Sequence, residues 1–198
     1  MKKIISLLSL CLIVILVSFT TLNTKKLIVI DAGHGGHDHG ATVDDLTEKG
    51  IVAKIANKIY EYNDPTTVEI VLLRDSDEFV SLSDRVLKIN ELNPDLVLSL
   101  HVNKSENKEA HGIELFISEK NAQYDSSEKY AQKILMNQNP LKLKQRGINK
   151  ANYLLLRQSK VAAITVELGF MSNENDKNYL TSEKGQNEIA ENIVKSLQ

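Results

Sequence analysis

The sequence predicts a single α/β domain whose mostly parallel sheet is covered by helices on both faces. Short apolar runs typical of buried strands alternate with helical patterns through most of the chain, and this order favours that fold class. The size supports one domain, because 198 residues with 42% hydrophobic and 25% charged side chains suit a globule with its own core. No internal repeat, linker or low-complexity stretch divides the sequence.

Capping residues and turn formers set the expected boundaries of the elements. Thr47 is placed to cap a helix that begins at Glu48, and Ser81 with Asp84 to cap a second helix. Further helices are expected over residues 126–137 and, at the end of the chain, over an apolar stripe at 189–197. The expected strands cover residues 27–31, 68–73, 96–100, 112–117, 153–156 and 161–166.

Residues 1–24 are predicted to be a signal peptide or an N-terminal membrane anchor, which leaves residues 25–198 as the domain. Lys2 and Lys3 precede an uncharged run, the layout of a secretory signal. The apolar segment 4–22 is also nearly long enough to span a bilayer, which takes roughly 20 residues, so attachment to a membrane stays open. Either interpretation predicts an exported protein of the periplasm or cell envelope.

Charge and cysteine usage exclude two classes of site. The formal net charge is −2 and Lys and Arg do not cluster, which argues against nucleic acid as a partner. Cys11 is the only cysteine and lies in the leader, so the domain has no disulfide and no thiolate ligand for zinc. A metal site in this domain must therefore use histidines and carboxylates.

Four residues fall where the expected elements would bring them to one edge of the sheet. His34, His101 and Glu167 each come at or just after the end of an expected strand. Glu48 begins the helix that is entered from the His34 loop. Ligands bind at the carboxyl ends of the strands in open α/β sheets, so these four side chains are predicted to form the functional site.

The residue types in this set favour a catalytic zinc ion. Two imidazoles and a carboxylate suit Zn²⁺, and three protein ligands leave a fourth position for water. Bound zinc lowers the pKa of water from about 15.7 to about 7, and a carboxylate that does not bind the metal can take the proton as the water attacks an amide. Glu167 is the natural candidate for that base, since its apolar sequence neighbours can raise its pKa.

Each residue taken alone has a simpler structural explanation. A single histidine is most often a surface residue or a satisfied core residue, and we keep that interpretation for His37, His39 and His111. Glu48 alone could be a favourable charge at a helix N-terminus. The GHGG segment could be a tight turn or a phosphate cradle, although no lysine follows it as in a P-loop. The metal hypothesis therefore depends on the whole set.

Five motifs follow one another along residues 26–198: IVIDAGHGGHDHGA with Glu48, LLRDSDEFVSLSDRV, LSLHVN, GIELF and ITVELGFMSN. In this order they resemble the zinc-dependent N-acetylmuramoyl-L-alanine amidases that cleave bacterial peptidoglycan. The resemblance implies a mixed sheet of about six strands, zinc bound by His34, Glu48 and His101, and Glu167 as the catalytic glutamate. It also implies hydrolysis of the amide bond between the lactyl group of N-acetylmuramic acid and the L-alanine of the stem peptide.

Departures from the family pattern leave the implied ligands unchanged: Ala32 replaces a proline, Leu73 a threonine and Val102 an alanine. Some relatives carry an inserted helix that plugs the zinc site between the second histidine and the last glutamate. Here the residues between His101 and Glu167 are all assigned to core elements, so we expect an open site. We also expect no separate wall-binding domain, and a monomer.

Two alternative functions stay open. A chain that keeps the fold without the activity would be a peptidoglycan-binding or amidase-regulating protein. The same metal and base would also serve a zinc peptidase of wall cross-links. The presence of all four site residues favours the amidase.

Overall fold

Six strands form the central sheet, in the spatial order β4-β1-β5-β8-β6-β7. β1, β4, β5 and β8 run parallel, β6 pairs antiparallel with β8, and β7 pairs parallel with β6. The prediction of a mixed, mostly parallel sheet of about six strands is confirmed. The strands are β1 (Lys26–Ala32), β4 (Val68–Leu72), β5 (Leu96–Asn103), β6 (Ile113–Ile117), β7 (Gln145–Lys150) and β8 (Ala162–Phe170).

The structure, a computed structural model, describes residues 25–138 and 141–198. The signal peptide or anchor predicted over residues 1–24, including Cys11, lies outside the described residues. Within these two ranges, no helix combines the length and the apolar character that crossing a membrane requires.

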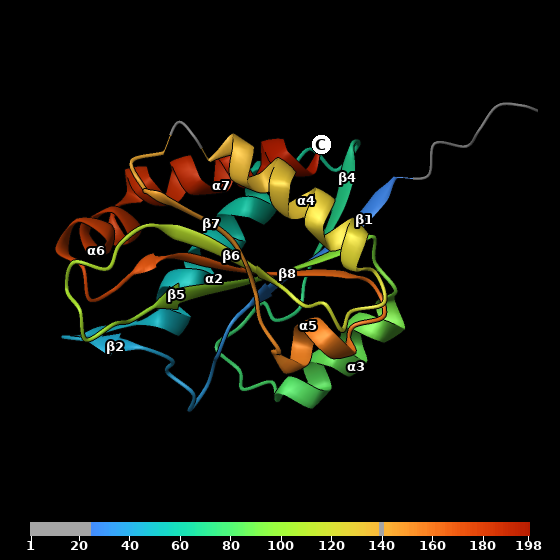
Figure 1. The fold of residues 1–198 in the computed structure, drawn as a ribbon, viewed down its shortest axis with the longest axis horizontal. Helices are drawn as coiled ribbons and strands as arrows, with labels where there is room; N and C mark the ends of the chain where they lie inside the picture. The colour runs from blue at the N-terminus through green and yellow to red at the C-terminus, as the bar shows by residue number, and fades with distance from the viewer. Residues whose placement is uncertain (1–24, 139–140) are drawn as a thin grey trace, which may run out of the picture.

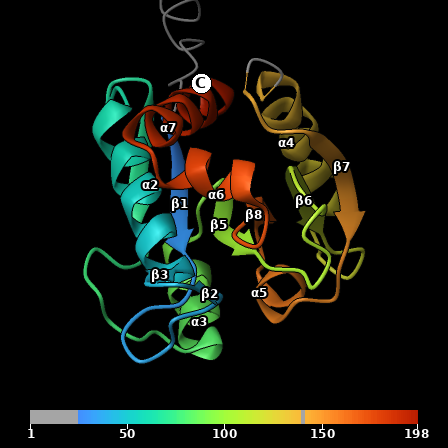
Figure 2. The same ribbon diagram turned by 90° about the vertical axis from the view of Figure 1, so that its left-hand side faces the viewer.

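Helices cover both faces of the sheet, as predicted. α2, α4 and α7 pack on one face, and α3 and α5 pack on the other. Figure 1 shows α4 and α7 on one side of the strands with α3 and α5 on the opposite side, and Figure 2 shows these layers from a second direction. The helices are α2 (Glu48–Tyr62), α3 (Leu82–Leu92), α4 (Tyr124–Asn137), α5 (Leu154–Gln158), α6 (Glu174–Thr181) and α7 (Glu183–Leu197).

The central strands are buried on both faces, which explains their sequences. Nearly every residue of β1, β5 and β8 is buried, so their apolar runs are continuous rather than alternating. Ile28 and Ile30 belong to the core cluster under α2 and α7, and Val29 to the cluster under α3. Full burial of such a side chain stabilises the fold by about 1.5–3 kcal/mol, so the ends of these strands are firmly held.

Both predicted N-caps are confirmed. The Thr47 side chain accepts a hydrogen bond from the Gly50 amide at the start of α2, and Ser81 accepts one from the Asp84 amide at the start of α3. The first cap fixes Glu48 as the opening residue of α2, where it is only 5% exposed.

One predicted strand is wrong, and one strand of the central sheet has no counterpart in the prediction. Tyr153 is the N-cap of α5 and residues 154–156 form its first turn, where the consecutive Leu155 and Leu156 are both buried. A short apolar run is compatible with a strand or a helix, and here it is a helix. β7 is an edge strand with the sequence QRGINK and no fully buried residue, so it carries no apolar signal. The prediction also omits α6 and the short hairpin of β2 (Thr42–Val43) and β3 (Leu46–Thr47).

β5 and β8 extend beyond their predicted ends. His101 and Glu167 therefore lie within strands rather than directly after them. The two residues are register partners in the parallel pair of β5 and β8. Neighbouring partners in a sheet project to the same side, so this pairing places both side chains on one face.

A buried carboxylate ties the ends of β6 and β8 to α6. Asp176 is 4% exposed, and its Oδ2 atom accepts hydrogen bonds from the Gly112 amide at 2.7 Å and the Phe170 amide at 2.9 Å. The Asn173 side chain caps α6 and accepts a bond from the Asp176 amide. This arrangement fixes the chain three residues beyond Glu167.

We expect Asp176→Ala to lower the free energy of unfolding by about 3 kcal/mol, because two buried amides lose a charged acceptor. Asp176→Asn, which keeps an acceptor oxygen, should lose less. Urea unfolding measures both, with Glu174→Gln on the exposed face of α6 as the control, expected within about 0.5 kcal/mol of the parent. Equal losses for the alanine and asparagine variants would contradict this role.

Candidate active site

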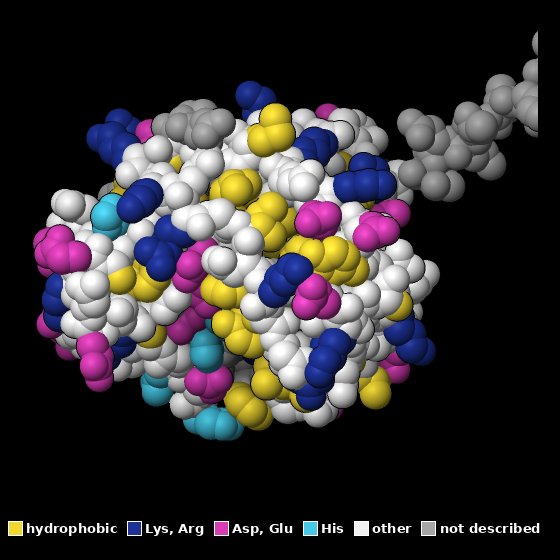
Figure 3. Space-filling model, in the orientation of Figure 1, with side chains coloured by type: hydrophobic (Ala, Val, Ile, Leu, Met, Phe, Trp, Pro, Cys, Tyr) yellow, Lys and Arg dark blue, Asp and Glu magenta, His cyan; other side chains and the backbone are white. Residues whose placement is uncertain are grey.

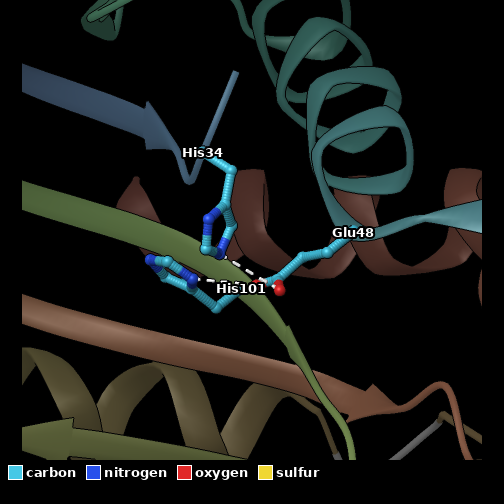
Figure 4. Close-up of side chains that lie close together, drawn as sticks. All are labelled: His34, Glu48 and His101. Atoms are coloured by element: carbon cyan, nitrogen blue, oxygen red, sulfur yellow. Dashed lines mark hydrogen bonds and ion pairs between the residues drawn. The ribbon is translucent and has the colours of Figure 1, made fainter. Parts of the chain in front are cut away.

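Three of the four predicted site residues converge on one point. His34 comes from the loop after β1, Glu48 from the first turn of α2 and His101 from β5, and Figure 4 shows their side chains pointing toward one another. His34 Nε2 lies 3.1 Å from Glu48 Oε2, and His101 Nδ1 lies 2.9 Å from Glu48 Oε1. The two imidazole rings meet edge to face, with centroids 5.1 Å apart.

The Glu48 carboxylate is held by the backbone as well as by the histidines. Oε1 accepts a hydrogen bond from the Val102 amide at 3.0 Å, and Oε2 accepts one from the Ala41 amide at 2.8 Å. Burial alone would raise the pKa of Glu48, but the hydrogen bonds from His101 and His34 outweigh it and hold the pKa well below its usual range. Glu48 is therefore ionised at any working pH.

The His34 side chain is oriented by an acid on its own loop. Asp38 Oδ2 lies 2.8 Å from His34 Nδ1, which leaves Nε2 directed at Glu48. Burial disfavours the charged imidazolium, yet the hydrogen bonds and negative charges of Glu48 and Asp38 raise the pKa of His34 to about 9. A carboxylate on the second ring nitrogen is the usual device that fixes a metal-binding histidine.

Two buried arginines hold the backbone around His34. His34 has a left-handed φ of 60°, a conformation that carries about 1–3 kcal/mol of strain in a non-glycine residue. Arg85 of α3 donates to the His34 carbonyl at 2.6 Å and forms an ion pair with Asp31, which also accepts from the Ser99 hydroxyl at 2.7 Å. Arg74 donates hydrogen bonds to the carbonyls of Ala32 and Gly33, at 2.9 and 3.0 Å. The strained turn is thus fixed by charged donors.

Glu167 stands beside this group but outside its hydrogen bonds. Within residues 25–138 and 141–198, its Oε2 atom is buried and has no hydrogen-bond partner. Burial is the main cause that raises the pKa of Glu167 to about 7, and the nearby Glu48 carboxylate adds to the effect while His101 opposes it. An acid with such a pKa can exchange a proton near neutral pH.

A cleft of about 730 Å³ opens onto these side chains. His34, His101 and Glu167 line its polar part, and Phe79 and Tyr153, each about half exposed, line its apolar part. Figure 3 shows acidic and histidine side chains gathered in a hollow of this face, with hydrophobic side chains beside them. Three of the four predicted site residues therefore line a cleft that is open to solvent, and Glu48 lies buried behind them.

The three converging residues fit a metal ion. One ligand atom from each of His34, Glu48 and His101 can be chosen so that all lie within 4.8 Å of one another. The loop is also packed tightly around them, because a Cβ at Gly40 would lie 2.5 Å from Glu48 Oε2 and 2.6 Å from His34 Cδ2. Gly40 has a φ of 64°, so both its conformation and its contacts require glycine.

The remaining histidines lie outside this group. His37 is exposed and stacks on Phe79 with ring centroids 4.2 Å apart, and His39 is exposed. The His111 Nδ1 atom lies 2.7 Å from the Glu109 carbonyl, in a loop. Among the described residues, none of the three belongs to the group of His34, Glu48 and His101.

Sequence reasoning missed the supporting residues. Nothing in the sequence connects Arg85 with the His34 loop, and the expected strand over residues 153–156 gives Tyr153 no role in the site. The one usable signal was the position of Asp38, four residues after His34 on a glycine-rich turn.

A sequence model described as N-acetylmuramoyl-L-alanine amidase matches residues 28–198. The chain belongs to that family. The resemblance carried by the ordered motifs, and with it the prediction of a peptidoglycan amide hydrolase, is confirmed at the level of the N-acetylmuramoyl-L-alanine amidase family.

Individual proteins are also similar to this chain over most of its length. The structure of N-acetylmuramoyl-L-alanine amidase AmiC2 of Nostoc punctiforme is similar with a TM-score of 0.77 and 34% identity, covering 87% of this chain and 94% of that one. The uncharacterized protein YqiI of Bacillus subtilis is 31% identical over 87% of this chain and 83% of its own length. The endolysin of Bacillus phage SPP1 is 33% identical over 84% of this chain, which spans 63% of the endolysin.

Arg85→Lys is expected to reduce the affinity for a divalent cation about 10- to 100-fold, because the lysine cannot hold the His34 carbonyl and Asp31 together. Arg85→Ala should in addition lower the free energy of unfolding by about 3–5 kcal/mol, because Asp31 would stay buried without its charged partner. Competition with a fluorescent chelator measures the affinity. Arg157→Lys, on α5, is the matched control, and an unchanged affinity in Arg85→Lys would refute the role.

Binding of a divalent cation should release a proton from His34. Since the pKa of the metal-free imidazole is about 9, the group is protonated at pH 7.5 and must lose its proton to bind the ion. Affinity should therefore rise with pH up to about 9, by about tenfold per pH unit for one proton. Calorimetry in buffers of different ionisation enthalpy counts the protons, and a pH-independent affinity between 7 and 9 would disprove the shift.

Proposed function

We propose that this chain hydrolyses the amide bond between the lactyl group of N-acetylmuramic acid and the L-alanine of the stem peptide. The observation that carries the proposal is the group of His34, Glu48 and His101 beside Glu167, whose buried Oε2 atom has no partner among the described residues. His34, His101 and Glu167 line an open cleft. Membership of the N-acetylmuramoyl-L-alanine amidase family indicates which amide bond is the substrate. Residues 25–198 form the catalytic domain in this proposal.

The donor set favours Zn²⁺ as the ion. Two neutral imidazole nitrogens and one carboxylate oxygen are the ligand types of catalytic zinc sites. When bound, zinc supplies a Lewis acid that polarises the scissile carbonyl and lowers the pKa of water to about 7. His34, Glu48 and His101 would hold the ion, and Asp38 would keep the His34 ring in the orientation that binding needs.

Glu167 would act as the general base. Its strand position opposite His101 places the two side chains on one face of the sheet, on strands about 4.8 Å apart. A pKa of about 7 lets the carboxylate take a proton from water and pass it to the leaving amine near neutral pH.

The N-terminal segment completes the proposal. Peptidoglycan lies outside the cytoplasmic membrane, so the site meets its substrate only after export. Residues 1–24 would direct that export as a signal peptide or keep the domain at the membrane as an anchor. We propose that the domain acts as a monomer in the cell envelope.

Glu167→Gln should lower turnover by about 10²- to 10⁴-fold, because it removes the base and leaves the ligands in place. Glu48→Ala should instead deplete the zinc content. The assay is the release, from purified sacculi, of peptides with a free L-alanine amino end, with and without a chelator and after zinc is restored.

Product mass separates the proposed reaction from its alternatives. An amidase frees the lactyl carboxylate of the sugar, whereas a peptidase of wall cross-links does not. Binding to sacculi without any product would indicate a silent wall-binding protein. Full turnover in Glu167→Gln would refute the general-base assignment while leaving the amidase assignment intact.

A further inference from the structure

A row of polar residues extends from the metal ligands toward the edge of the sheet. Register pairs His101 on β5 with Glu167 on β8, Glu167 with Glu114 on β6, and Glu114 with Gly147 on β7. Directly paired residues share one face of a sheet, and strands lie about 4.8 Å apart. The row thus leads about 10 Å from Glu167 to β7, in the direction away from the metal ligands.

Glu114 is a buried carboxylate that holds an arginine in place. It is 7% exposed and accepts hydrogen bonds from Arg146 Nε at 2.9 Å, Asn103 Nδ2 at 3.2 Å and Asn149 Nδ2 at 3.5 Å. The Phe170 ring lies under the guanidinium, with its centroid 4.9 Å from the Arg146 Cζ atom. A buried acid and an aromatic ring therefore fix the plane of the Arg146 side chain.

The two terminal nitrogens of Arg146 can still bind a ligand. Only Nε is used in the pair with Glu114, and among the described residues the two terminal nitrogens have no hydrogen-bond partner. About a third of the side chain is exposed to solvent. The two terminal nitrogens form a planar fork that matches the two oxygens of a carboxylate.

We propose that Arg146 binds a carboxylate in the peptide half of the substrate, and that Glu114 is the positioning residue that aims it. This inference rests on the proposed function. A peptide in extended form advances about 3.3 Å per residue, and β6 lies about 4.8 Å from β8. A peptide cleaved beside Glu167 and running along the row therefore has the residue after L-alanine at the level of β6, where Glu114 holds the Arg146 guanidinium and a carboxylate on that residue can meet it. The substrate class is thus a muramoyl peptide whose second residue carries a free carboxylate.

Two small substrates test this subsite on the zinc-loaded protein: N-acetylmuramoyl-L-alanyl-D-glutamic acid and the same compound with its glutamate carboxylates amidated. We expect kcat/KM to favour the acid in the parent protein. Arg146→Gln should lower kcat/KM about tenfold for the acid and less than about twofold for the amide. Arg146→Lys, which keeps the charge but loses the fork, should fall between them.

Lys150→Gln is the matched control, because it removes an equal charge from the same strand, where Lys150 forms an ion pair with the exposed Glu119. It should leave the preference for the acid unchanged. Equal losses on both substrates in Arg146→Gln would show a merely structural pair with Glu114 and overturn the proposal. Equal cleavage of both compounds by the parent protein would also overturn the proposal, but it would leave the amidase function intact. If the parent protein cleaved neither the two compounds nor sacculi, the amidase function itself would be overturned.

Discussion

The Glu48 carboxylate is the group on which the site depends. Each of its oxygens faces one histidine and accepts a backbone amide, from Val102 in β5 or from Ala41 in the loop before α2. One side chain thereby joins the β1 loop, β5 and α2. Because it is buried, its charge must be compensated by these donors or by a cation. The fold provides the hydrogen-bond donors, and in the proposed function a bound zinc ion would provide the positive charge.

The position of Glu48 follows from ordinary helix and sheet physics. Thr47 caps α2, so the helix begins at the residue that the site requires, and the apolar face of α2 packs on the sheet. The loop that carries His34 has less intrinsic stability, since its backbone is left-handed at that residue. Buried arginines compensate for this strain, which explains why the LLRDSDEFVSLSDRV segment, with no catalytic residue of its own, accompanies the site motifs.

The sequence was sufficient to predict most of the sheet, the two capped helices and the convergence of His34, Glu48 and His101, because continuous apolar runs and caps are local signals. It was insufficient where the signal is tertiary. β7 has no apolar pattern since it lies at the edge, and Leu155 and Leu156 fit a strand or a helix until their packing is known. Arg146 could not be connected with the site, because its relation to Glu114 exists only through the pairing of β6 with β7.

Glu114 and Glu167 show how neighbouring strands assign different roles to the same residue type. Two carboxylates directly opposite each other repel, and the structure resolves the conflict unequally. Glu114 accepts hydrogen bonds from three donors, among them Arg146, whereas the Oε2 atom of Glu167 has no partner among the described residues and the pKa of Glu167 is raised by burial. Along one register row, two residues of the same type thus have different environments, and the difference lies in the hydrogen-bond donors around them.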